Sequence, residues 1–93
     1  MDRGEVRWCV LEPPDKERPV LILTNSDAIR HLNAVTIAPV TSTIREVPSE
    51  VRLSTDDGML MDYVVNLHNI VTLRKKRIGR YITTLSSARM REV

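Results

Sequence analysis

The chain has 93 residues, 42% of them hydrophobic and 28% charged, and its net charge is +2. This length predicts one domain over residues 1–93 with a modest core, so association into a homodimer would add buried surface. The chain has no apolar run of the ~20 residues that a membrane-spanning helix needs, and no signal-peptide core at its start. Its single cysteine, Cys9, cannot form an internal disulfide, which fits a reducing compartment. We therefore expect a cytoplasmic protein without a membrane segment.

The first half of the chain predicts three β-strands, each an alternating or continuous apolar run between polar turns. They are expected at residues 5–11, 20–23 and 35–40. Cys9 is expected to be half buried on the first strand, and the run 20–23 (VLIL) is typical of a central strand buried on both faces. Residues 12–19 predict a charged, proline-rich loop, and 24–34 a polar connection with one helical turn. Pro39 requires a bulge or an edge position because proline cannot donate to a sheet ladder.

The second half predicts three more strands and two short helices. The strands are expected at residues 50–53, 63–67 and 80–84. A short helix is expected over 72–77, with Gly79 just after its end, and a terminal helix over 87–93 begins at a cap supplied by Ser86 or Ser87. Short strands with so little helix predict a mainly β fold, a small and strongly bent barrel.

Charge is distributed unevenly along the chain. Residues 1–62 carry seven Lys/Arg and eleven Asp/Glu, whereas residues 63–93 carry seven and one, and the cluster RKKR occupies 74–77. Such a basic zone is typical of a surface that binds a polyanion, although many basic runs are merely solvated. Charge alone therefore leaves nucleic-acid binding and a simple solvated surface both open.

Polar residues stand at the ends of two predicted strands. Arg18 precedes the second strand, and Thr41 and Ser42 follow the third. A guanidinium with a few hydrogen-bond donors can stabilise the charge that builds on phosphorus when RNA is cut without a metal. The alternative is that Arg18 caps a strand and the hydroxyls form an ordinary turn. His31 and His68 have no Cys or carboxylate at ligand spacing, so neither a metal site nor a cofactor is expected.

Six segments, taken in order, resemble the MazF/PemK family of type II toxin endoribonucleases, part of the CcdB/PemK-like superfamily. They are RGEV (3–6) with Trp8, RPVLILTN (18–25), APVTSTI (38–44), VVNLHNI (64–70), TLRKKRIGR (72–80) and LSSARMREV (85–93). The resemblance covers nearly the whole chain. It implies an SH3-like barrel of the CcdB/PemK toxin type with a C-terminal helix, a homodimer, and a cognate antitoxin that blocks the site. It also implies metal-independent, sequence-specific cleavage of single-stranded RNA, which inhibits translation and growth.

The resemblance implies roles for individual residues. Arg18 matches the family's catalytic arginine and Thr41 its conserved hydroxyl, with Ser42 as a weaker RNA-binding candidate. In well-studied relatives, the strand expected here at 63–67 ends with an arginine and an aspartate that assist catalysis or binding, but Asn66 and His68 stand at those positions. Period-2 geometry places both on one face. His68 either exchanges a proton with the reacting groups, or only packs or contacts phosphate.

The expected mechanism is attack by the ribose 2′-hydroxyl on the adjacent phosphorus, which leaves a 2′,3′-cyclic phosphate and a 5′-hydroxyl. Arg18 and Thr41 hold the phosphate, and either His68 or Glu17 accepts the proton; Glu17 alternatively orients Arg18 through a salt bridge. The basic residues expected to guide the RNA strand are Arg74, Lys75 and Arg77. Two other functions stay open, a CcdB-like gyrase-binding toxin on the same scaffold and a decayed homologue that binds RNA or antitoxin without turnover.

Overall fold

The computed structural model describes residues 1–10 and 17–93, so most of the loop predicted over 12–19 lies outside the described residues. The described strands are β1 (Glu5–Cys9), β2 (Arg18–Ile22), β3 (Ala34–Thr41), β4 (Glu50–Leu53), β5 (Tyr63–Asn66), β6 (Val71–Arg74) and β7 (Ile78–Thr84). The helices are α1 (Ser26–Ile29) and α2 (Ser87–Glu92), with 3-10 turns η1 (Thr55–Asp57), η2 (Leu67–Asn69) and η3 (Lys75–Arg77). The predicted mainly β class with a C-terminal helix is confirmed. No described helix has the length and apolar character needed to cross a membrane.

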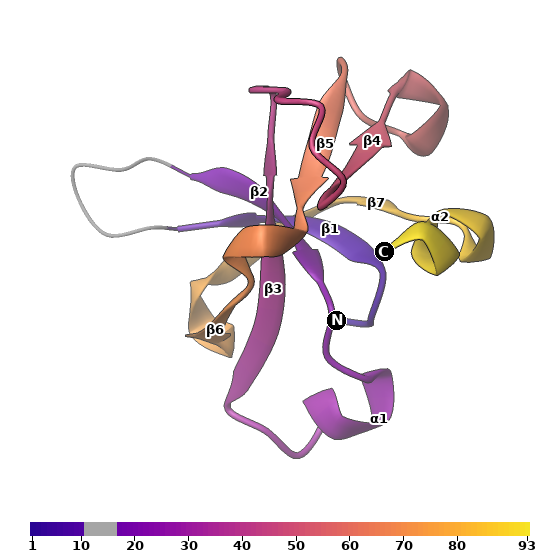
Figure 1. The fold of residues 1–93 in the computed structure, drawn as a ribbon. Helices are drawn as coiled ribbons and strands as arrows, with labels where there is room; N and C mark the ends of the chain where they lie inside the picture. The colour runs from indigo at the N-terminus through magenta and orange to yellow at the C-terminus, as the bar shows by residue number, and fades with distance from the viewer. Residues whose placement is uncertain (11–16) are drawn as a thin grey trace.

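Strand β3 is the hub of the sheet. The hydrogen-bonded order is β4-β5-β3-β2-β1-β7, and β6 pairs with β3 as well. Every pair is antiparallel, and β3 contacts β2 along one edge and β6 and then β5 along the other. In Figure 1, β3 runs vertically through the centre, with the other strands arranged around it. Within the described part of the chain no ladder joins β4 to β7, so the sheet is strongly bent but not hydrogen-bonded into a closed barrel.

Pro39 lies within β3 at the point where the strand changes partners. On one edge Pro39 faces Val20 of β2. On the other edge Ile37 is the last residue paired with β6, and Val40 is the first paired with β5. The proline therefore lies in the gap between two ladders, where its missing N–H interrupts neither of them. This gap explains how a proline is accommodated in a strand at the centre of the sheet.

Apolar side chains cover both faces of β2. Leu21 packs into one core cluster, whereas Val20 and Ile22 pack into a second cluster together with Cys9. The prediction of a central strand buried on both faces is thus confirmed. Cys9 is fully buried rather than half buried, because the second cluster covers it. Each large aliphatic side chain removed from water in this way contributes about 1.5–3 kcal/mol to folding.

The helix predicted over 72–77 is wrong. Residues 71–74 form strand β6 instead, and only η3 coils after it. The Thr72 hydroxyl, expected near a helix start, shares a hydrogen bond of 2.9 Å with the Thr36 hydroxyl across the β3–β6 pair. Gly79 lies inside β7 and ends no helix. Pairing with β3 satisfies the backbone groups of this segment, and a local helical reading of the sequence cannot foresee that partner.

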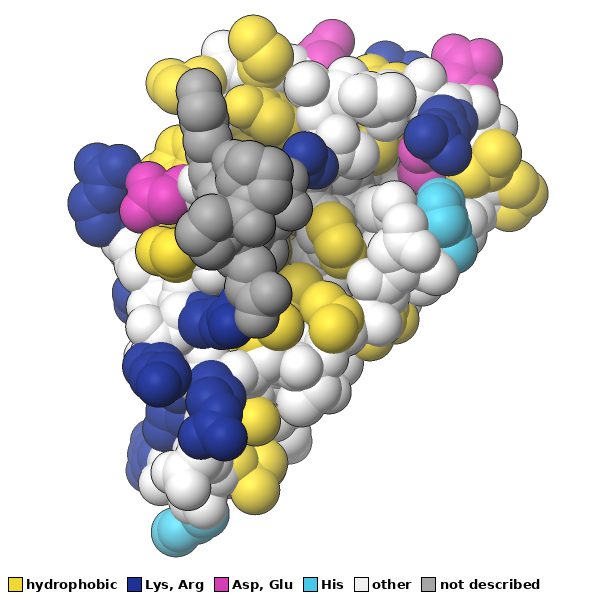
Figure 2. Space-filling model, turned by 90° about the vertical axis from the view of Figure 1, so that its left-hand side faces the viewer, with side chains coloured by type: hydrophobic (Ala, Val, Ile, Leu, Met, Phe, Trp, Pro, Cys, Tyr) yellow, Lys and Arg dark blue, Asp and Glu magenta, His cyan; other side chains and the backbone are white. Residues whose placement is uncertain are grey.

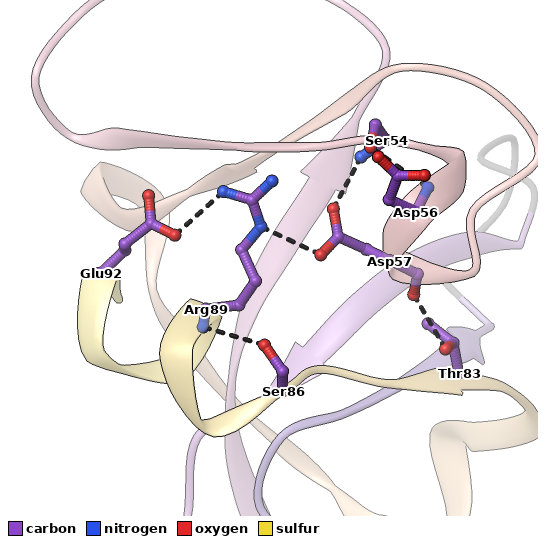
Figure 3. Close-up of polar contacts among 7 residues, drawn as sticks. All are labelled: Ser54, Asp56, Asp57, Thr83, Ser86, Arg89 and Glu92. Atoms are coloured by element: carbon purple, nitrogen blue, oxygen red, sulfur yellow. Dashed lines mark hydrogen bonds and ion pairs between the residues drawn. The ribbon is translucent and has the colours of Figure 1, made fainter.

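Helix α2 is attached to η1 by a polar network (Figure 3). The Ser86 hydroxyl accepts from the Arg89 backbone N–H at 3.1 Å, which confirms Ser86 as the cap. Arg89 Nε donates to Asp57 Oδ1 at 2.9 Å, and the Ser54 N–H donates to Asp57 Oδ2 at 2.9 Å. Burial raises the pKa of the Asp57 carboxyl, but these two hydrogen bonds outweigh it and the pKa lies below its ordinary value. Asp57 is therefore ionised at neutral pH and binds α2 as a charged partner.

Candidate nucleic-acid interface

Arg18 and Thr41 meet because of the register between β2 and β3. The pairs Val20↔Pro39 and Leu21↔Ala38 fix that register. Continued by two residues, it brings Arg18, the first residue of β2, opposite Thr41, the last residue of β3. Both residues line a cleft of about 300 Å³ and an adjoining hollow of about 250 Å³. The two strand ends singled out from the sequence therefore form one site.

The cleft is electropositive. Its described lining consists of Arg18, Pro39, Thr41, Thr43, Arg45, Asn66 and Asn69. The adjoining hollow adds Pro19, Val40, Ser42 and Tyr63. The described lining of both spaces thus includes two arginines, several hydroxyl and amide donors, and no carboxylate. Guanidinium groups and neutral donors are the partners that a phosphodiester prefers in proteins.

A local turn orients the Thr41 hydroxyl. The Thr43 backbone N–H donates to Thr41 Oγ1 at 3.1 Å, a side-chain turn typical of threonine at the end of a strand. Since this bond uses an oxygen lone pair, the hydroxyl hydrogen is left to donate into the cleft. The ordinary turn that was the alternative interpretation of these hydroxyls is therefore present, and it also orients the Thr41 hydroxyl as a hydrogen-bond donor.

The sequence reasoning missed Thr43, Arg45 and Asn69. Arg45 reaches the cleft on the segment after β3, which one carboxylate fixes in place: Glu50 Oε1 accepts from the backbone N–H of Arg45 at 3.0 Å and of Glu46 at 2.9 Å. The hydroxyl-rich run 41–43 and a nearby arginine were visible in the sequence. That the segment folds back onto the cleft depends on Glu50, whose contact has no sequence signature.

Asn66 and His68 do not share a face, so that prediction is wrong. Strand β5 ends at Asn66, whose side-chain oxygen accepts from the His68 backbone N–H at 3.2 Å and begins the turn η2. Asn66 lines the cleft, whereas His68 is absent from its described lining. His68 Nδ1 instead lies 2.6 Å from the Ser49 hydroxyl in a hydrogen bond.

Glu17 and Arg77 lie near Arg18 without lining the cleft described above. Glu17 is exposed and immediately precedes Arg18. The Arg77 carbonyl accepts from the Val10 N–H at 2.9 Å, beside β1. Burial raises the pKa of the Cys9 thiol, and the positive charge of Arg77 only partly offsets this rise. Arg77 thus contributes positive charge next to β1, one strand away from β2.

Arg74 and Lys75 lie at the far end of β3 from the cleft. Arg74 pairs with Ala34, the first residue of β3, whereas Thr41 is the last. Seven residues of strand at ~3.3 Å each separate these ends by about 23 Å. Arg74 and Lys75 line a different hollow of about 280 Å³, together with Asn33 and Lys76. The structure therefore does not bring these two predicted RNA-binding residues into the cleft.

Comparison with known proteins gives a consistent family. Residues 2–93 match the model of the PemK-like, MazF-like toxin of type II toxin-antitoxin systems. The chain is 38% identical to the probable endoribonuclease MazF2 of Mycobacterium tuberculosis over 99% of this chain and 89% of that protein. Among solved structures, the Mycobacterium tuberculosis toxin MazF-mt6 is similar with a TM-score of 0.86 at 34% identity, over 95% of this chain and 86% of that one. A mycobacterial endoribonuclease in complex with its cognate antitoxin is similar with a TM-score of 0.86 at 32% identity, over 99% and 85%. The chain belongs to the PemK-like, MazF-like family of type II toxin-antitoxin toxins.

Proposed function

We propose that this chain is an endoribonuclease toxin that cuts single-stranded RNA at a short sequence without a metal ion and so inhibits translation and growth. The observation that carries the proposal is the pairing of Arg18 with Thr41 in an electropositive cleft whose described lining lacks a carboxylate. The relatives named as endoribonucleases favour this activity over gyrase binding on the same scaffold.

The mechanism is a transesterification at one phosphodiester. The ribose 2′-oxygen loses its proton to a base and attacks phosphorus, and the bond from phosphorus to the 5′-oxygen breaks. The leaving 5′-oxygen takes a proton from water, so the products are a 2′,3′-cyclic phosphate and a 5′-hydroxyl. The Arg18 guanidinium holds two non-bridging oxygens, and the Thr41 hydroxyl donates to one of them. Negative charge increases on these oxygens in the transition state, so both contacts strengthen as the reaction proceeds. Asn66 and Ser42 contact the flanking nucleotides.

The proton from the 2′-hydroxyl goes to Glu17 or to His68. Glu17 is exposed and immediately precedes Arg18, so its carboxylate is open to an RNA bound at Arg18. His68 is absent from the described lining of the cleft, and its Nδ1 is hydrogen-bonded to Ser49, so Nε2 is the ring nitrogen left to exchange a proton with the RNA. Loss of activity in Glu17→Gln with retention in His68→Asn would assign the proton to Glu17, and the opposite pattern would assign it to His68.

The partners follow from the same proposal. A relative of this chain has been solved with its cognate antitoxin. We infer that this chain also binds a cognate antitoxin that blocks the cleft, and that it acts as a homodimer in the cytoplasm. Gel filtration tests the homodimer, and co-purification with a candidate antitoxin tests the second association.

The decisive experiment incubates the purified protein with a long single-stranded RNA in EDTA and maps the ends. We expect cuts at one recurring short sequence, with 2′,3′-cyclic phosphate and 5′-hydroxyl ends, and no cleavage of DNA. Arg18→Ala should reduce the cleavage rate about 100- to 1000-fold, the loss typical of removing one transition-state donor. Arg91→Gln, an exposed arginine on α2, is the matched control and should cleave normally.

Two outcomes would contradict the proposal. Full activity in Arg18→Ala, or cleavage of DNA, which lacks the 2′-hydroxyl, would rule out the mechanism. Absence of RNA cleavage together with inhibition of gyrase would support the CcdB-like alternative instead.

A further inference from the structure

The end of β3 far from the cleft has a concentrated positive surface. Its hollow of about 280 Å³ is lined by Asn33, Arg74, Lys75 and Lys76. Lys75 Nζ donates to the Ile29 carbonyl at 2.8 Å, and the Lys75 N–H donates to the Asn33 carbonyl at 2.9 Å. These bonds fix the turn η3 against the end of α1 and the segment that follows it. The flanking Arg74 and Lys76 are both exposed.

Apart from Asp27 on α1, the elements around this surface contain no carboxylate that could neutralise it. No Asp or Glu occurs between Asp27 and Glu46, or between Asp62 and Glu92. These stretches include all of β3, β5, β6, η3 and β7. Figure 2 agrees, since dark blue side chains gather in the lower left of that face and its lower half shows no magenta. The positive charge is therefore available to an external anion.

The positive surface and the start of β2 are on the same side of the molecule. In Figure 1 both β6 and the start of β2 lie on the left, and that side faces the viewer in Figure 2. The spacing of about 23 Å along β3 corresponds to about seven nucleotides stacked at ~3.4 Å each, and to fewer in an extended strand. A single RNA strand of modest length can thus reach from one site to the other.

We propose that Arg74 and Lys76, with Asn33, form a second RNA-binding surface that holds phosphates several nucleotides away from the scissile bond. The inference rests on the proposed function, because it assumes that RNA is the substrate in the cleft. The surface adds affinity for long RNA and contributes nothing to an RNA that fills only the cleft. Its phosphate contacts do not depend on base identity.

The chemistry of the surface favours RNA over an acidic protein segment. The described lining of the hollow has only cationic and amide side chains, which suit phosphate oxygens. Beside it the exposed Thr72 hydroxyl, hydrogen-bonded to that of the half-buried Thr36, offers a further polar contact. A protein segment binds tightly by burying apolar or aromatic anchors, and this lining provides no pocket for one.

The test measures binding of labelled 2′-O-methyl oligouridylates, which cannot be cut by attack of a 2′-hydroxyl. A short strand of about four nucleotides fills only the cleft, whereas a long strand of about sixteen reaches both sites. We expect the wild-type protein to bind the long strand on the order of tenfold more tightly than the short one, after correction for the number of positions at which the protein can bind the long strand. Arg74→Gln with Lys76→Gln should bring that ratio close to one. It should also reduce the slope of log affinity against log salt by about 1.4 for the long strand, which is ~0.7 for each lost contact.

The matched control removes two exposed arginines elsewhere, with Arg52→Gln and Arg91→Gln, and should keep the wild-type ratio of long- to short-strand affinity. If the double variant at the surface misfolds, Lys76→Gln alone should still lower the ratio, because Lys76 lies in an exposed turn rather than a strand. A wild-type ratio in a folded Arg74/Lys76 variant would overturn the inference. So would unchanged RNA binding with weakened antitoxin binding, which would assign the surface to a protein. Failure of the proposed function is a separate result, namely absence of RNA cleavage by the wild-type protein.

Discussion

Replacing Arg89 by methionine should destabilise the attachment of α2. The change removes the guanidinium and keeps an unbranched side chain of similar length. Arg89 Nε lies 2.9 Å from Asp57 Oδ1, and Nη1 lies 2.9 Å from Glu92 Oε2 (Figure 3). The Asp57 side chain is only 8% exposed and would retain the hydrogen bond from the Ser54 N–H. The variant thus leaves a nearly buried carboxylate without its charged partner.

The expected loss lies between that of a surface pair and that of a buried pair. Breaking a buried pair costs about 3–5 kcal/mol, whereas exposed pairs contribute about 0–1 kcal/mol. Because Arg89 is 31% exposed and Asp57 is 8% exposed, we expect the free energy of unfolding to fall by about 2 kcal/mol. For a domain of this size, that corresponds to a Tm lower by about 10 °C.

A double-mutant cycle with Asp57→Asn checks this reasoning, with unfolding followed in urea at one fixed protein concentration. The coupling between the two positions should be about 1–2 kcal/mol, whereas Glu92→Gln, whose side chain is 52% exposed, should cost less than about 0.5 kcal/mol. The pKa of Asp57 is lowered in the folded state, so the contribution of the pair is complete above the ordinary value of 3.8 and is lost as the pH falls through the folded-state value. The stabilities of wild type and Arg89→Met should therefore converge in acid. Additive effects of the two substitutions would refute the argument.

Two further predictions concern the fold. Gly58→Ala should lower the free energy of unfolding by about 2–4 kcal/mol, because the glycine has φ of +90° and a Cβ would lie 2.3 Å from Thr83 Oγ1. Adding Thr83→Ala should recover part of this loss in a urea melt, and no recovery would show that the clash is unimportant. Cys9 should react slowly with a thiol reagent in the native protein and rapidly in denaturant, since it is fully buried and burial raises its pKa. Equal rates would contradict its burial.

The pattern of apolar residues in the sequence predicted most of the strands. In these strands apolar side chains either alternate with polar ones or occupy every position, and both patterns are typical of a β-strand. The run 20–23 is the clearest case, since apolar side chains on both faces require a central strand, and β2 is one. The prediction of a helix over 72–77 is wrong because the burial of this segment follows no such pattern. Only residues 71–74 form a strand, and Val71 and Thr72 do favour one, but the strand is short, mostly exposed and followed by basic residues. Its pairing with the ladder from Ala34 to Ile37 of β3 is not visible in the local sequence.

The sequence by itself determined the chemistry at the two strand ends, Arg18 and Thr41, because residue type and position relative to an apolar run are both local properties. Only the tertiary structure decided what joins them. The antiparallel register of β2 and β3 places the pair together, and a carboxylate at Glu50 holds Arg45 at the same cleft. The same strand β3 keeps Arg74 about 23 Å away, although both basic groups look alike in the sequence. The register between paired strands determines which residues that are distant in the sequence lie close together in space. A local sequence pattern does not reveal which strands pair or in which register.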